Sequence, residues 1–503
     1  MSDPIYETDI FSLRAAMGDG RLTARAITEA YIARIGQIDQ GPGGLRAVLE
    51  LNPDALIIAD ARDAERAAGQ LRGPLHGIPI LLKDNIDTAD GMHTTAGSLA
   101  LLGSRPVQDA EVARRLRAAG AVILGKTNMS EWANFRSSRS TSGWSARGRQ
   151  TRNPYVLDRS PCGSSSGSAA AVAASLCAAA LGSETDGSIV CPSSFCGVVG
   201  IKPTVGLTSR AGVIPISSTQ DSVGPHGRTV ADAAIVLGVI AGPDPRDPAT
   251  AAVEGRFVRD YAQFLDRNGL RGARVGVLRS GKVFGYHIDT DRVAAEASAV
   301  MAAQGAVIID PLFTPEDVPM SDPAEYEVML FEFKAGLNAY LARCGGDLPR
   351  SLAELISFNT ANHEREMPYF GQEIFLMAEE KGGLDSPAYQ DALRRSRDNA
   401  RNAIDSLMIQ HHLDAIIMPS ESPAGLTDLV NGDHFLGGSS ALAARAGYPL
   451  ITVPAGHAYG LPVGITFMGR AFSEPALIRL AYAFEQASLS RRPPRLLPTL
   501  DLP

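Results

Sequence analysis

Small residues and hydroxyl groups are concentrated between Ser160 and Ser194, in a pattern that could support nucleophilic chemistry. The segment reads "SPCGSSSGSAAAVAASLCAAALGSETDGSIVCPSS" and contains almost no large side chain that could fill a core. Within it, "ETDGSI" places Ser188 directly after a glycine, where successive backbone N–H groups can converge on a developing oxyanion. One such donor stabilises an acyl-transfer transition state by about 3–4 kcal/mol. The segment therefore favours acyl transfer to a serine.

A lysine at the end of an apolar run could act as the base for these serines. The run "IPILLK" ends at Lys83 and places it inside or at the rim of a sheet. A free lysine has a pKa of about 10.4, so only about one in two thousand is neutral at pH 7. Burial penalises the charged form, and lowering the pKa to about 7.5 would cost about 4 kcal/mol. Taken alone, Lys83 is typical of a surface lysine after a strand; the serine segment strengthens its interpretation as a base.

Two other motif matches do not fit the chemistry of their motifs. The stretch "GAVILGKT" (Gly120 to Thr127) matches a phosphate loop, but its apolar middle residues are typical of a strand and could not curl around a phosphate. The stretch "GSSSG" (163–167) matches a serine elbow, but a polar loop precedes it where the elbow needs an apolar strand. The nine histidines form no metal set, and no partner stands out, since His76 falls in a turn and His226 in a loop. A base other than histidine is therefore favoured.

The composition is typical of a soluble globular protein, with 45% hydrophobic and 20% charged residues. The net charge of −8 argues against nucleic acid or an anionic membrane as a partner. No apolar run approaches the roughly 20 residues of a membrane helix. The N-terminal "MSDPIYETDIFSLRAAM" lacks the basic start and apolar run of a signal peptide. We expect a cytoplasmic protein, or an exported one if a leader once preceded these residues.

The cysteines predict no disulfide framework. They are odd in number, none belongs to a CxxC motif, and no histidine lies at zinc-finger spacing. We expect small buried or free thiols, which favours a reducing compartment. The five positions are Cys162, Cys177, Cys191, Cys196 and Cys344.

Apolar strands alternate with helices along most of the chain, and these elements must position the serines and the lysine. This alternation predicts an α/β fold with a central mixed, mostly parallel, twisted sheet that helices cover on both faces. The expected strands lie at 46–51, 78–83, 121–125, 274–280, 306–310, 414–420 and 449–456, and the expected helices at 54–69, 109–120, 229–242, 291–305 and after residue 167.

The alternation stops between about residue 310 and residue 412, where the sequence is mainly helical and more charged. This segment is typical of a helical insertion on the sheet, because no flexible linker separates it from the rest. We therefore expect one domain over 1–503. Its catalytic core motifs would occupy about 76–242, and a C-terminal return to the core about 413–490.

Five ordered blocks of the chain resemble the amidase-signature hydrolases. They are "HGIPILLKDNI", "AVILGKTNMSEWANF", "TRNPYVLDRSPCGSSSGSAAAVAA", "GSETDGSIVCPSSFCGVVGIKPT" and "GLPVGITFMG". Most lie between about residues 76 and 242, with further agreement near 448–484, so the resemblance spans nearly the whole chain. It implies a single large amidase-signature domain that needs no metal and no cofactor.

The resemblance also implies a role for each of three residues. Lys83 corresponds to the catalytic lysine, Ser164 to the bridging serine, which follows a cis peptide bond, and Ser188 to the nucleophile. Neutral Lys83 would accept a proton through Ser164 while Ser188 attacks the amide carbon, and water would then hydrolyse the acyl-enzyme. The substrate-binding residues that the family implies are Ser165 and, through backbone N–H groups of an oxyanion hole, Thr185, Asp186, Gly187 and Ser188.

Three departures from the family pattern indicate which subgroup of the family the chain resembles. Asp186 replaces a glycine and Val190 the usual arginine beside the nucleophile, and a long loop, "NFRSSRSTSGWSARGRQTRNPY", precedes the serine motif. With "EFKAGL" in the insertion, these features resemble bacterial peptide amidases, which remove the C-terminal amide from peptides. We expect residues 132–135 to close the leaving-group side of the site and the insertion to cover the acyl side.

Three other functions stay open on the sequence. An amidotransferase-type protein with glutaminase activity and a general small-amide or aryl acylamidase belong to the same family, and a non-catalytic binding module could share the fold. The intact set of Lys83, Ser164 and Ser188 disfavours the binding module. The expected partner is a small-molecule or peptide amide, with no nucleic acid and no membrane, and the expected state is a monomer or homodimer.

Overall fold

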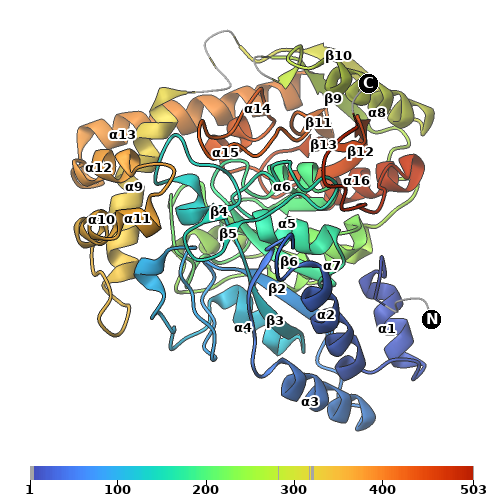
Figure 1. Cartoon of the computed structure of the whole chain (residues 1–503). Coiled ribbons are helices and arrows are strands. Elements are labelled where there is room, and N and C mark those ends of the chain that lie inside the picture. The colour runs from blue at the N-terminus through green and yellow to red at the C-terminus, as the bar shows by residue number, and fades with distance from the viewer. Residues whose placement is uncertain (1–4, 281–282, 316–317, 319–321, 502–503) are drawn as a thin grey trace.

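One open mixed sheet runs through the protein in this computed structural model, which describes residues 5–280, 283–315, 318 and 322–501 (Figure 1). Eleven strands follow the order β1-β3-β2-β6-β8-β7-β12-β13-β11-β9-β10. Their bounds are β1 (Val48–Leu51), β2 (Pro79–Lys83), β3 (Val122–Thr127), β6 (Ala179–Glu184), β7 (Val199–Lys202), β8 (Ser222–Gly227), β9 (Arg274–Leu278), β10 (Val307–Leu312), β11 (Ala415–Pro419), β12 (Leu450–Ala458) and β13 (Leu461–Met468), and a separate ribbon pairs β4 (Trp144–Ser145) with β5 (Arg149–Gln150).

The mixed sheet is confirmed, but it contains less parallel pairing than the expected "mostly parallel" arrangement. Within the described residues, β2 pairs in parallel with β3 and β6, and β9 with β10 and β11. The other six pairings are antiparallel. Five of the six involve β6, β7, β8 or β13, strands that the sequence pattern did not predict. Glycine and proline interrupt "SVGPHG" and "LPVGITFM", so β8 and β13 lack a clear strand pattern.

Helices cover both faces of the sheet. The central strands β2 and β11 are buried along their whole length, as expected for strands packed on two sides. Every residue of the Ser/Ala-rich helix α5 is also buried, because small side chains let it lie close to β2, β3 and β6. The bounds of these helices are α1 (Ile10–Gly18), α2 (Ala24–Ile38), α3 (Ala55–Ala67), α4 (Glu111–Ala118), α5 (Ser166–Ala173), α6 (Val190–Phe195), α7 (Val230–Ile240), α8 (Ile288–Ala303), α15 (Ala441–Ala446) and α16 (Glu474–Ser488).

A group of helices lies beside the sheet, at the left of Figure 1. The first of them contributes Phe333, Leu337 and Leu341 to an apolar cluster that also holds Trp132. The exact division of the chain into core motifs, insertion and C-terminal return stays a prediction. The helices at the left are α9 (Pro323–Leu341), α10 (Leu352–Ala361), α11 (His363–Glu366), α12 (Glu373–Glu379) and α13 (Pro387–Leu393), and a short π-helix then leads to α14 (Asn399–Gln410), which lies beside α15.

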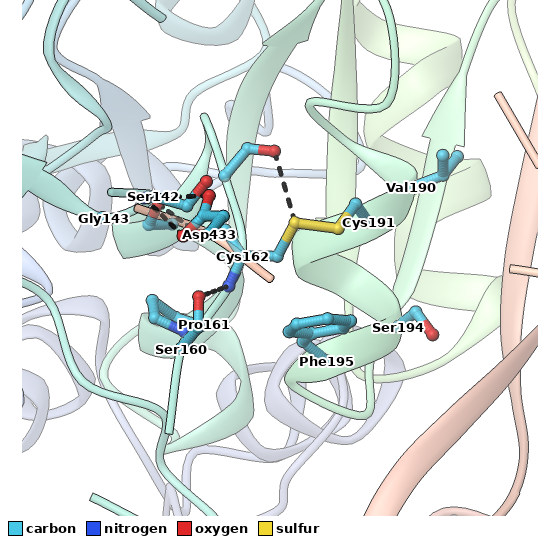
Figure 2. The surroundings of a disulfide bond; sticks show 12 residues. Ser142, Gly143, Ser160, Pro161, Cys162, Val190, Cys191, Ser194, Phe195 and Asp433 are labelled. Carbon is cyan, nitrogen blue, oxygen red and sulfur yellow. Dashed lines mark hydrogen bonds between the residues drawn. A yellow bond between two sulfur atoms is a disulfide. The ribbon is translucent and has the colours of Figure 1, made fainter. Parts of the chain in front are cut away.

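The prediction that all cysteines are thiols is wrong for two of them. Cys162 and Cys191 form a disulfide across 6.0 Å between their Cα atoms (Figure 2). Cys177 and Cys196 are free and buried, and Cys344 is free and partly buried. A disulfide of this loop length typically stabilises a fold by about 2–4 kcal/mol. The sequence could not reveal the pair, because its 29-residue separation carries no motif, and the inference of a reducing compartment loses its basis.

Two further expectations from the sequence concern the phosphate-loop match and membrane-spanning helices. The phosphate-loop match falls on β3, whose residues are all buried, so its backbone is paired in the sheet and does not form a loop. In the part of the chain that the structure describes, no helix is long and apolar enough to cross a membrane.

Candidate active site

Lys83 lies at the carboxyl end of β2 and is fully buried. Its Nζ donates a hydrogen bond to Ser164 Oγ at 2.8 Å. It also lies 3.0 Å from both the backbone oxygen and the Oγ of Ser183. Asn85 Nδ2 donates to the same Oγ at 2.9 Å, which keeps that hydroxyl facing the lysine. The apolar run before Lys83 therefore places its amine among oxygen atoms of Ser164 and Ser183.

Burial lowers the pKa of Lys83 to about 7. The carboxylates of Asp221 and Glu184 act against this effect and raise the pKa. Close to neutral pH, a large fraction of Lys83 is therefore unprotonated and can accept a proton. The direction of this change is the one that the sequence argument required for a lysine that acts as a base.

Ser164 is presented to Lys83 by an unusual backbone. The Gly163–Ser164 peptide bond is cis, as the family resemblance implied. The backbone N–H of Ser130 donates to the carbonyl of Ser164 at 3.1 Å. A side chain at Gly163 would overlap Ser130 Oγ, so glycine is required there.

Ser188 lies in the turn between β6 and α6 and keeps 8% of its surface exposed, whereas Ser164 and Lys83 keep none. Its backbone oxygen accepts a hydrogen bond from the N–H of Ser165 at 3.2 Å, so the two serine segments meet. No hydrogen bond between the described residues joins Ser188 Oγ to Ser164 Oγ. The turn is held by Glu184, whose Oε2 accepts from the N–H groups of Ile189 and Val190 at 2.6 and 3.0 Å. The structure thus brings the chain segment of Ser188 against the segment that carries the buried lysine–serine pair.

The backbone N–H groups of residues 185–188 donate no hydrogen bond to any other described residue, so they are available to a substrate. Gly187 has φ +79°, which a side chain would disfavour. Thr185 anchors the turn, because its Oγ1 donates to Asp221 Oδ1 at 2.6 Å. Ser165 is engaged within the protein: its N–H donates to Ser188, and its Oγ lies 3.1 Å from the Ser183 carbonyl.

The carboxyl group of Asp186 is held within the protein. Its side chain is hydrogen-bonded to Ser440, while its Oδ1 is buried and has no hydrogen-bond partner among the described residues. Burial raises the pKa of Asp186, and the positive charges of Arg445 and Lys202 act in the opposite direction. The carboxyl group therefore faces the protein beneath the turn that carries Ser188.

A narrow cavity, large enough for about one water molecule, lies beside Ser164. Its lining is polar at Asn85, Ser164, Ser183, Thr185, Arg210, Asp221 and Ser222 and apolar elsewhere. A second, adjoining cavity shares some of these walls and extends toward the helical segment. The apolar lining residues of the two cavities are Ala96, Met129, Trp132, Ala133, Val213, Ile214, Pro215, Ile216, Val223 and Phe333.

The segment 132–135 and the helices of 323–379 lie on the same side of these cavities. Trp132 packs against Phe375 with ring centroids 5.8 Å apart, and Phe135 packs against Phe333 at 5.2 Å. This packing joins the two segments in one apolar cluster; the expectation that one closes the leaving-group side and the other covers the acyl side stays a prediction. The two segments form one wall because their aromatic side chains share a single cluster.

Sequence reasoning misplaced one residue and missed others. His226, expected in a loop, lies in β8, and its Nδ1 is 2.8 Å from Ser193 Oγ. Burial and the nearby charge of Lys83 lower the pKa of His226 to about 3, so it is neutral. Ser183 and Glu184 were missed although they adjoin "TDGS", and Asp221 lies in "TQDSVG", which carries no motif.

Comparisons with known proteins agree with this geometry. The family model described as Amidase matches residues 26–478. A protein of Arabidopsis thaliana named as a probable amidase is 46% identical, over 98% of this chain and 92% of its own length. A glutamyl-tRNA(Gln) amidotransferase component of Chloroflexus aurantiacus is 36% identical, over 96% of this chain and 97% of its own.

Among solved structures, native peptide amidase from Stenotrophomonas maltophilia superposes with a TM-score of 0.94. It is 52% identical, and the match covers 98% of this chain and 99% of that one. The family model and the high identity over nearly both full lengths encompass the whole sheet and its site. The chain therefore belongs to the amidase signature family and is an amide hydrolase.

Proposed function

We propose that the protein hydrolyses the C-terminal carboxamide of peptides through an acyl-enzyme, with Lys83, Ser164 and Ser188 as a proton relay. The observation that carries this proposal is the 2.8 Å hydrogen bond between fully buried Lys83 Nζ and Ser164 Oγ, in a segment that Ser165 joins to Ser188. A buried amine whose pKa is about 7 can remove a proton that an ordinary lysine could not.

In the first step, neutral Lys83 accepts the proton of Ser164 while Ser164 accepts the proton of Ser188. The Ser188 Oγ forms a bond to the amide carbon, and the carbonyl oxygen becomes an oxyanion. The proton then returns through Ser164 to the amide nitrogen, the C–N bond breaks, and ammonia leaves. Water attacks the resulting ester in a second passage through the same relay and releases the free carboxylate.

The turn 185–188 would stabilise the oxyanion of both passages. Its unengaged backbone N–H groups lie beside Ser188, and donors placed this way lower the barrier without having to reorganise. The hydrogen bond that Thr185 donates to Asp221 and those that Glu184 accepts from the backbone N–H groups after Ser188 keep the turn in place. No side-chain donor is needed for this role, which fits the replacement of the usual arginine by Val190.

Two observations support the proposed preference for a peptide substrate: the apolar residues that line the cavities, and the similarity to a peptide amidase. Apolar walls such as Ile214 and Ile216 suit the side chain beside the scissile amide, and ammonia as a leaving group needs little room. The 52% identical relative is named as a peptide amidase. Release of ammonia from glutamine is the second candidate, because an amidotransferase component is 36% identical over nearly the whole chain.

The first test is the digestion of an amidated peptide of about ten residues by the purified protein, followed by mass spectrometry. We expect loss of the terminal amide alone, which raises the mass by about one dalton, with Ser188→Ala as the blank. Amidated dipeptides should release ammonia faster than acetamide or glutamine, because contacts to the rest of the peptide contribute to turnover. Internal fragments, or glutamine as the preferred substrate, would contradict the proposal.

The second test is the pH dependence of kcat/KM. Since neutral Lys83 is the base, the rate should rise with pH through an apparent pKa near 7 and then level off. The titratable groups around Lys83 are Asp221 and Glu184, which raise its pKa, and His226, which is neutral. Because the Asp221 carboxylate raises the pKa of Lys83, Asp221→Asn should move the acid limb to lower pH by about one unit.

The comparison variant is Thr185→Val, which keeps the Asp221 carboxyl group but removes a hydrogen bond that lowers its pKa. Its acid limb should move in the same direction as that of Asp221→Asn, and by less. An acid limb that stays in place in Asp221→Asn, or that moves to higher pH, would show that the Asp221 carboxylate does not raise the pKa of Lys83.

A further inference from the structure

The disulfide joins the two segments that carry the relay serines. Cys162 lies two residues before Ser164, and Cys191 lies three residues after Ser188, in the first turn of α6. Figure 2 shows the bond bridging the loop at Pro161 and the helix that begins at Val190. We call these parts of the chain the Ser164 segment (160–166) and the Ser188 segment (185–196).

The remaining ties between the two segments are weak or distant from the sulfur atoms. The N–H of Ser165 donates to Ser188 O at 3.2 Å, and Cys196 Sγ lies 3.7 Å from Pro161 O. Asn153 Nδ2 bridges the carbonyls of Ser160 and Phe195. These contacts would keep the fold together without the disulfide, but only the S–S bond sets the separation of the segments covalently.

Other contacts hold each segment to a different part of the protein. The Ser164 segment is bonded to Gly425 through the N–H of Ser160 and to Ser130 through the carbonyl of Ser164. The Ser188 segment is bonded to Glu184 and, through Thr185, to Asp221. Without the cross-link, the two segments could therefore shift against each other while each keeps its own anchors.

The two ends of the disulfide differ in their exposure to solvent. Cys162 is partly exposed, whereas Cys191 is buried with Tyr155, Phe195 and Ala424 in an apolar cluster. A dithiol can attack the sulfur of Cys162 and displace the Cys191 thiolate. Its second thiol then closes on the mixed disulfide, so the dithiol loses two electrons and two protons, and the protein gains two thiols.

We propose that the Cys162–Cys191 disulfide is a positioning element for the relay, which holds Ser164 and Ser188 at the separation needed for proton transfer and makes turnover sensitive to thiol reductants. This proposal rests on the proposed function, since it assumes that both serines act together. Catalysis is sensitive to such positions, because a shift of about 1 Å can cost about a hundredfold in rate.

The test compares the purified full chain in its oxidised form with protein treated with dithiothreitol and then freed of reductant. Thiol titration and mass spectrometry identify the state of Cys162 and Cys191. We expect kcat for an amidated dipeptide to fall about tenfold on reduction, with KM within about twofold, and to recover on reoxidation. The double variant C162S/C191S should have the lower kcat with or without reductant.

Cys344→Ser is the matched control, because it removes the partly exposed free thiol far from these segments in sequence. It should respond to reductant as the parent does. Near-ultraviolet circular dichroism follows the packing of the core in each form and should stay unchanged. Equal kcat in fully oxidised and fully reduced protein, absence of the disulfide from the oxidised protein, or loss of the native spectrum on reduction would each overturn the proposal.

A second readout separates this proposal from the choice of substrate. A fluorophosphonate acylates an activated serine whatever the natural substrate is, so its rate of reaction with Ser188 reports on the relay alone. That rate should also fall about tenfold on reduction. If amidated peptides are not hydrolysed but the labelling rate still falls on reduction, then only the proposed substrate is wrong. If the labelling rate is the same in the oxidised and reduced protein, the positioning role is overturned.

Discussion

Ser188→Ala is expected to reduce amide hydrolysis by about 10⁵–10⁶-fold, because it removes the atom that forms the acyl-enzyme. The fold should survive, since alanine is smaller than serine and Ser188 Oγ makes no hydrogen bond to another described residue. Ammonia release from an amidated dipeptide measures the loss, and thermal unfolding measures the stability of the variant.

Covalent labelling identifies the nucleophile independently of the substrate. The parent should gain one fluorophosphonate adduct on the peptide that contains Ser188, and the alanine variant none. Ser164→Ala is the matched comparison: it breaks the relay but keeps the nucleophile, so it should still be labelled, at a much lower rate. An adduct on any other residue of the parent would show that Ser188 is not the nucleophile.

Lys83→Arg is expected to lose about 10³–10⁴-fold in kcat although it keeps a positive charge, because a guanidinium cannot release its proton at a working pH. Lys83→Met, which has nearly the same length and no charge, should be equally inactive. Both results follow from the assignment of the neutral amine, not the ammonium ion, as the acting species. Steady-state rates between about pH 6 and about pH 10 measure the effect, since no pH in this range should restore the arginine variant.

Lys126→Arg is the matched control for the size of the guanidinium. Lys126 is also fully buried on a neighbouring strand, where its Nζ donates to Ile86 O at 2.6 Å and Thr94 Oγ1 at 2.9 Å. Its replacement should lower the unfolding temperature but leave the activity of the folded fraction within about tenfold of the parent. Activity of Lys83→Arg within about tenfold of the parent would refute the role of Lys83 as the base.

The strand before Lys83 could be predicted from its immediate neighbours in the chain, whereas the lysine itself was typical of a surface position until the serine segment was considered. The run "IPILL" is apolar at every position, so it forms a strand buried on both faces and carries the lysine inward with it. The same reasoning correctly rejected the phosphate loop, since "VILGKT" is β3. Family resemblance then added the cis peptide bond before Ser164, which no local pattern could indicate.

The antiparallel part of the sheet was not predictable in the same way. Strand β8 reads "SVGPHG", and its pairing with β6 and β7 depends on neighbours that lie far away in the chain. Strand propensity reports how a side chain fits a pleated surface, and glycine and proline fit it poorly in isolation. The position of His226 was therefore misjudged together with the strand that holds it.

The meeting of distant residues at the site is a property of the folded chain. Asp221 lies 36 residues from Thr185, and Cys191 lies 29 residues from Cys162, yet each pair is in direct contact. Local patterns repeat every two residues in a strand or about 3.6 in a helix, so they report the neighbours of a residue within one element. Contacts between elements depend on how the whole chain closes on itself. For this reason the strand that ends at Lys83 could be predicted from the sequence, whereas the carboxylate that modulates the lysine pKa and the disulfide that joins the two serine segments could not.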